Sequence, residues 1–292
     1  MKAHRMLKVT VWLLAAAGTL LIALPPAHSM EGITAVYSRA SADYVRAMLP
    51  DGSRQSEAYA FGEGGYHGAA IRDETIDYMT FADVARAIAR PLAGQDYVPA
   101  KDPNTTRLLI MVYWGATDGA ADFSSLNIAS AHGNRGRSRG NGAWDYASVF
   151  TGGTWGLGNG WWGSGSTQAA MTDTRNASIL GYADELTRFG SAANRERGDL
   201  ISEVEFSRYF VVLMAYDFQL MWRHNQRKLL WESRFSIREQ GNDFTVALPA
   251  MAQYAAVYFG RDSHGLLRTR VPDGRIYMGD PTLIEFLTDA RK

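Results

Sequence analysis

A histidine followed by two carboxylates is the first group in this chain that could do chemistry. His67 precedes Asp73 and Glu74 by a few residues. A neutral imidazole near a carboxylate can act as a general base, and carboxylate oxygens can bind a divalent cation. The spacing matches no standard ligand pattern, so we predict no metal site. The alternative interpretation is a solvated loop whose acidic residues stabilise the N-terminus of the next helix.

Asp217 is a second candidate because it lies within an apolar stretch, residues 210–222. A carboxylate buried in such a stretch has a raised pKa, which is common at functional sites. It also falls where one face of the expected strand becomes polar. The alternative is therefore an exposed cross-strand pair with a basic residue such as Arg234.

No recognised catalytic motif accompanies these residues. The small-residue run at 163–166 lacks the strand before it and the helix after it that a nucleophile elbow needs. The sequence contains no His-Glu-x-x-His zinc motif and no phosphate-binding loop with its lysine. We therefore assign no catalytic residue and expect no cofactor.

The segment from residue 115 to residue 170 is rich in glycine and tryptophan. It holds 13 of the 29 glycines and shows no hydrophobic periodicity, which indicates a long irregular insertion. Its four tryptophans are Trp144, Trp155, Trp161 and Trp162. Tryptophan provides stacking platforms and binding hot spots, so these side chains are our candidate binding residues. The alternative is that they fold back and hold the segment to the core.

Helices and strands are expected on both sides of this insertion. Residues 80–92 carry a Thr80/Asp83 capping pair and one apolar stripe, which predicts a helix. The wholly apolar residues 108–114 predict a central strand. Before them, residues 42–49 and 55–61 predict two strands joined by a turn, and the glycines at 62, 64 and 65 predict a break.

The second half of the chain predicts a helix, a hairpin and another helix. Helical spacing covers residues 173–189, and residues 210–222 predict one long strand. Residues 229–239 alternate like a half-buried hairpin partner with Glu232 and Arg234 facing outward. A last helix begins at Asn242 or Asp243, and a final hairpin ends at residue 278.

The N-terminus and the composition indicate export. Residues 1–29 contain basic residues, an apolar run and small residues before Met30, the order of a signal peptide. The alternative is an uncleaved anchor. Removing the three basic residues of this leader from the 30 in the chain leaves 27 against 30 acidic residues, which does not favour nucleic acid. The chain has no cysteine, so packing alone must stabilise it.

This order of elements, with Arg227-Lys228-Leu229-Leu230-Trp231 opening the strand after the long one, resembles a known group. It is similar to exported α+β domains of bacterial envelope proteins in families of unknown function, many of them lipoproteins. The similarity covers residues 55–114 and 205–260. The chain departs from that pattern because it has no lipid-attachment cysteine and carries the insertion. The resemblance implies an envelope compartment and a fold class, and it transfers no catalytic residue.

Together, these observations predict one α+β domain over residues 30–292. We expect a mainly antiparallel sheet of about five to seven strands, with about two or three helices on one face. The predicted function is a non-enzymatic binding or assembly module of the periplasm or cell envelope, with another protein or a glycan as partner. The alternative is a hydrolase of envelope or extracellular polymers that uses His67 and nearby carboxylates. Membrane contact is expected only if residues 1–29 stay attached.

Overall fold

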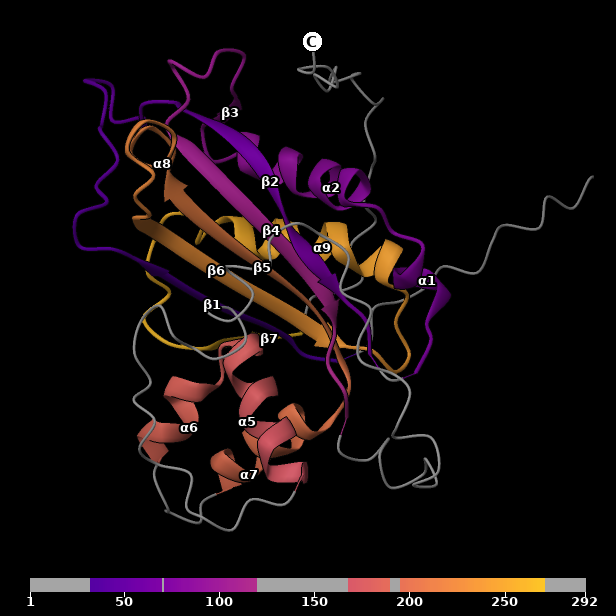
Figure 1. The fold of residues 1–292 in the computed structure, drawn as a ribbon. Helices are drawn as coiled ribbons and strands as arrows, with labels where there is room; N and C mark the ends of the chain where they lie inside the picture. Colours follow the sequence, from indigo (N-terminus) through magenta and orange to yellow (C-terminus); the bar gives the residue numbers. More distant parts are fainter. Residues whose placement is uncertain (1–31, 70, 120–167, 190–194, 271–292) are drawn as a thin grey trace, which may run out of the picture.

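The computed structural model describes residues 32–69, 71–119, 168–189 and 195–270 (Figure 1). Within these ranges the chain forms one seven-stranded sheet with helices on both faces. The strands are β1 (Thr34–Ala40), β2 (Glu57–His67), β3 (Tyr97–Pro99), β4 (Leu108–Ala116), β5 (Arg208–Asp217), β6 (Leu229–Arg238) and β7 (Leu267–Thr269). The helices are α1 (Glu74–Asp77), α2 (Phe81–Ala93), α5 (Gln168–Leu180), α6 (Ala183–Phe189), α7 (Arg195–Glu205), α8 (Phe218–His224) and α9 (Phe244–Ala256).

The sheet is mixed, in the order β3-β2-β4-β5-β6-β1-β7. β2 pairs in parallel with β3 and with β4. From β4 to β7 every neighbouring pair is antiparallel. The α+β class and the expected number of strands are thus confirmed. The prediction of an antiparallel sheet holds only between β4 and β7 in the sheet order. After β2, helix α2 returns the chain to the end of the sheet where β2 starts, so β3 and β4 run parallel to β2.

Two separate cores cover the two faces of this sheet. On one face α2 and α9 pack on the strands, and Val211 and Leu213 of β5 point into that core. On the other face α5, α6 and α7 pack on Val212 and Met214 of the same strand. The prediction of two or three helices on one face was therefore wrong. β5 is apolar on both sides because both of its faces are covered.

Several predicted elements are confirmed. Thr80 caps α2 in a reciprocal capping box with Asp83. β4 is an interior strand between β2 and β5, and Asp243 is the N-cap of α9, which contains Pro249 in its interior. The helical stretch at 173–189 is divided into α5 and α6 at Gly181, which has a φ of +81°.

Other predictions were wrong. The apolar stretch at 210–222 is not one strand, because β5 ends at Asp217 and α8 follows. Glu232 and Arg234 of β6 are buried rather than exposed, since α5 covers their face. Residues 42–49 form no strand beyond an isolated bridge from Met48 to Arg54. The last part of the predicted final hairpin lies outside the described residues.

Candidate functional site

His67 lies at the end of the sheet where β2 and β4 finish and β5 begins. It is opposite Gly115 in the register, and only 6% of the residue is exposed. Its ring centre is 6.2 Å from that of Phe210. Burial, and secondarily the charge of Arg175, lower the pKa of His67 to about 4. The imidazole is therefore neutral at pH 7 and enclosed by its own fold.

Asp73 lies on the chain between β2 and α2 and fastens α1 to the sheet. Its carboxylate accepts a hydrogen bond from the backbone N–H of Thr75 at 2.8 Å, which makes it the N-cap of α1. The Tyr209 hydroxyl of β5 also donates to this carboxylate. Burial and then this bond raise the pKa of Tyr209 above its ordinary value. Glu74 is exposed in the first turn of α1. Asp73 and Glu74 thus begin a short helix, α1, that precedes the helix predicted at residues 80–92.

Asp217 lies at the opposite end of the sheet from His67. The register places Asp217 opposite Leu108, the first residue of β4, and His67 opposite Gly115 near its end. Seven strand residues separate these two positions, which corresponds to about 23 Å. Asp217 is half-buried and caps α8 by accepting from the backbone N–H of Leu220 at 2.9 Å. Asp217 and His67 are therefore not brought together.

Arg234, the predicted partner of Asp217, lies elsewhere. It is opposite Val212 in the middle of β5. Its guanidinium is 3.1 Å from the Glu232 carboxylate and donates to the backbone oxygen of Ser178, near the end of α5, at 2.9 Å. This buried pair holds α5 on the sheet, because a cation at a helix C-terminus meets carbonyl oxygens that lack partners within the helix.

The four candidate binding tryptophans, Trp144, Trp155, Trp161 and Trp162, lie outside the described residues. The structure does describe the flanks of their segment, up to residue 119 and from residue 168. On the β4 side, Thr117 accepts from the backbone N–H of Arg208 at 3.0 Å, and its own N–H donates to the Arg208 carbonyl at 2.9 Å. On the α5 side, the Asn176 amide donates to the Asp118 carbonyl at 2.7 Å. Both flanks are joined to buried parts of the domain.

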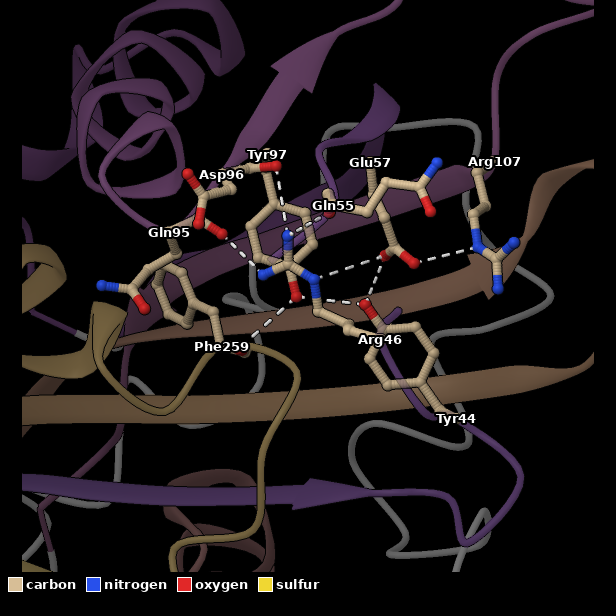
Figure 2. A network of polar contacts seen from close by, with 9 residues as sticks. All are labelled: Tyr44, Arg46, Gln55, Glu57, Gln95, Asp96, Tyr97, Arg107 and Phe259. Atoms are coloured by element: carbon tan, nitrogen blue, oxygen red, sulfur yellow. Dashed lines mark hydrogen bonds and ion pairs between the residues drawn. The ribbon is translucent and has the colours of Figure 1, made fainter. Parts of the chain in front are cut away.

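The structure also contains a buried polar network that the sequence did not reveal (Figure 2). At its centre is Glu57, the first residue of β2, which is buried. The Tyr44 hydroxyl donates to its carboxylate at 2.5 Å, and the Arg107 guanidinium lies 3.0 Å from it. The Tyr44 hydroxyl is also 3.1 Å from that of Tyr97 in β3. Burial is the main reason that the pKa of Tyr97 rises to about 12.

Arg46 completes this network from the same segment as Tyr44. Its guanidinium donates to the backbone oxygens of Gln95, Gln55 and Asp96 at 2.6, 3.0 and 3.2 Å. It also lies 4.3 Å from the centre of the Tyr97 ring. Figure 2 shows these groups converging from the segment before β2, the β2 start and the β3 start. The network fastens residues 44–57 to the edge of the sheet, and a sequence pattern does not reveal it because its partners come from distant parts of the chain.

Neither a metal-binding cluster nor a membrane-spanning helix occurs in the described part of the chain. No group of three or more His, Cys, Asp or Glu side chains in it is arranged to hold a metal ion. None of its helices is both long enough and apolar enough to span a bilayer.

Comparisons with known proteins find distantly similar solved structures and no matching family model. No family model and no curated protein matches the chain. One similar structure is a PDZ domain protein from Parabacteroides distasonis, with 10% identity and a TM-score of 0.39, covering 82% of this chain and 39% of that one. Another is a DUF4136 family protein from Bacteroides thetaiotaomicron, with 11% identity and a TM-score of 0.33, covering 80% of this chain and 98% of that one. These similarities are distant, and no residue role is taken from them.

Proposed function

We propose that this chain is an exported, non-enzymatic binding or assembly module of the cell envelope. In this proposal the packed sheet is a scaffold, and residues 120–167 supply the contact with a partner protein or a glycan. The observation that carries the proposal is the pair of attachment points at Thr117 and Asn176. A long segment that is rich in glycine and tryptophan and joins two ordered flanks of a packed domain suits recognition, because loops carried on a rigid scaffold commonly hold binding residues.

The arrangement of the candidate catalytic residues supports binding rather than hydrolysis. Asp73 and Asp217 both cap helices, and the register separates Asp217 from His67 by most of the length of β4. A general base and its carboxylate must lie within hydrogen-bond reach of the same substrate. The leader at residues 1–29 supports an envelope location, since it has the order of a signal peptide.

A deletion of residues 120–167, closed with a short Gly/Ser linker, tests this proposal. The deletion keeps Thr117, Asp118 and all of α5, so the attachment contacts stay intact. We expect it to retain cooperative unfolding in urea and to lose retention of envelope protein or of insoluble cell-wall glycan in co-sedimentation. The double variant Trp161→Ala, Trp162→Ala should show the same loss without any deletion.

Trp222→Ala is the matched control, because it removes a tryptophan outside this segment. It should retain the same envelope protein and glycan as the unchanged chain. If the deletion and the double variant both fold and both bind as well as the unchanged chain, the segment is not the binding element. If the deletion abolishes cooperative unfolding, the tryptophans belong to the core and the proposal is wrong.

A further inference from the structure

Helix α8 is unusual because it is apolar and yet has no buried residue. It carries Phe218, Leu220, Met221 and Trp222, and half of Trp222 is exposed. Trp222 is exposed, and Phe218, Leu220 and Met221 are partly exposed, so this short helix keeps apolar surface in water that contact with another surface would bury. The sequence could not show this, because the same residues fit the face of a strand.

The conformation of α8 is fixed by contacts at both ends. Asp217 caps its start, and at its end Asn225, with a φ of 50°, donates its N–H to the Met221 carbonyl at 3.0 Å. The Gln219 amide donates to the carbonyls of Pro103 and Thr106, each at 2.7 Å, which holds α8 on the loop between β3 and β4. Trp222 and the partly exposed apolar side chains beside it are therefore displayed by an ordered helix.

The charged residues within α8 and the turn after it are all basic. Residues 218–228 contain Arg223, Arg227 and Lys228 and no Asp or Glu. The Arg223 guanidinium lies 5.5 Å from the Trp222 ring centre, and both arginines are exposed. Lys228 forms an ion pair with Asp43 at 3.1 Å. A helix that combines Trp and Phe with adjacent basic residues has the composition of an interfacial helix at an anionic surface.

A second exposed apolar group lies at the same end of the sheet. β1 ends opposite the start of β6, and α8 connects β5 to β6 there, so the segment between β1 and β2 begins beside α8 (Figure 1). In this segment Tyr44 and Arg46 are buried, while Val45 is 76% and Met48 61% exposed. The buried network of Figure 2 holds the polar side chains inward and leaves the aliphatic ones facing solvent.

We propose that this end of the sheet docks on the surface of an anionic lipid bilayer through residues 218–228, with Val45 and Met48 beside them. Charge complementarity with the lipid headgroups favours a bilayer as the occupant, and Trp222 suits the headgroup level, where an indole places its ring in the apolar region and its N–H in water. The inference is independent of the proposed function, since Thr117 and the attached segment lie at the other end of β4. This membrane contact does not require that residues 1–29 stay attached.

Vesicle co-sedimentation of the chain from Met30, which contains every described element, tests this proposal. We expect binding to vesicles that contain phosphatidylglycerol, weak binding to pure phosphatidylcholine vesicles, and release at high salt. Each basic side chain near an anionic surface contributes about a five-fold gain. The variant Arg223→Glu, Arg227→Glu should therefore bind at least about 25-fold more weakly, and Trp222→Ala about ten-fold more weakly.

The matched control is Arg72→Glu with Arg86→Glu, which reverses two exposed charges away from α8 and should bind within about two-fold of the unchanged chain. The proposal is wrong if the chain from Met30 does not sediment with the anionic vesicles at low salt. It is also wrong if the α8 variants bind as the control does. The variant Trp161→Ala, Trp162→Ala should bind vesicles as well as the unchanged chain does, even where it no longer retains its partner. Failure of one proposal is therefore distinguished from failure of the other.

Discussion

The Tyr44 hydroxyl donates a hydrogen bond to the Glu57 carboxylate at 2.5 Å, and both residues are buried. This bond joins the segment after β1 to the first residue of β2. Burial is the largest cause that raises the pKa of Tyr44 well above its ordinary value, so the phenol stays protonated and remains a donor. Because a buried carboxylate without donors is costly, Glu57 depends on this bond and on its ion pair with Arg107.

The first prediction concerns a substitution that removes that hydroxyl. Tyr44→Phe leaves the ring in place but deprives Glu57 of a donor, so we expect a loss of about 1–3 kcal/mol in the free energy of unfolding. Urea denaturation followed by circular dichroism measures it. Tyr78→Phe is the control, because Tyr78 is 77% exposed and its change should stay within about 0.5 kcal/mol. Equal effects of the two substitutions would contradict a stabilising role for the network.

The second prediction concerns Gly260, which follows α9 and lies against the same network. Its φ is +69°, and a Cβ there would be 2.2 Å from the Tyr97 hydroxyl and 3.0 Å from the Tyr44 ring. Gly260→Ala therefore adds a steric clash to the backbone cost, and we expect about 2–4 kcal/mol of destabilisation in urea. Gly52→Ala separates the two terms, because Gly52 has a φ of +83° and nothing within 4 Å of the added Cβ. It should cost about 1 kcal/mol. Similar losses of stability in Gly260→Ala and Gly52→Ala would show that the neighbouring tyrosines move away from the added Cβ.

Local signals in the sequence predicted the elements whose causes are local. The capping pair of Thr80 and Asp83, the apolar run of β4 and the N-cap Asp243 each act within a few residues, and the structure has all three. The end of β5 was missed for a related reason. Alternation continues in Phe218, Leu220 and Trp222, and only the cap formed by Asp217 marks the change to a helix.

The glycines of β2 show why the rest was not predictable from local patterns. Gly62 and Gly64 indicated a break, but both lie inside β2, and a Cβ on Gly64 would be 2.6 Å from the Tyr113 ring of the neighbouring strand. They allow close approach of β4 side chains, and the predicted break is a register irregularity between Glu63 and Gly65 inside the strand rather than a turn. Similarly, the alternation of Glu232 and Arg234 predicted an exposed face, because nothing local shows that α5 covers it. The position of Asp217 relative to His67 depends on strand order, which is a property of the whole sheet.

The third prediction is a pH dependence that arises from His67. Its pKa is about 4 in the folded state and 6.5 in the unfolded state, so the unfolded state binds the proton more tightly between those values. The stability that the neutral imidazole supplies is complete above pH 6.5 and is lost as the pH falls toward 4. Between pH 7.5 and pH 5 we expect the free energy of unfolding to fall by about 2 kcal/mol from this group.

Comparison of His67→Gln with the unchanged chain isolates that contribution, because other groups titrate alike in both. Urea unfolding at pH 7.5 and pH 5 should show about 2 kcal/mol less acid loss in the variant. His264→Gln, at a side chain that is 90% exposed, should keep the full loss. An unchanged acid loss in His67→Gln would mean that the ring is hydrated rather than enclosed.

The fourth prediction distinguishes a helix cap from a catalytic carboxylate at Asp217. Asp217→Ala removes the acceptor for the Leu220 N–H, so we expect a loss of about 1 kcal/mol in the free energy of unfolding. Asp217→Asn keeps an oxygen acceptor at the cap and should stay within a few tenths of a kcal/mol of the unchanged chain. Urea denaturation of the two variants at pH 7.5 provides the comparison. If Asn destabilises as much as Ala, the charge rather than the capping oxygen is what α8 needs, and the interpretation of Asp217 as a cap does not hold.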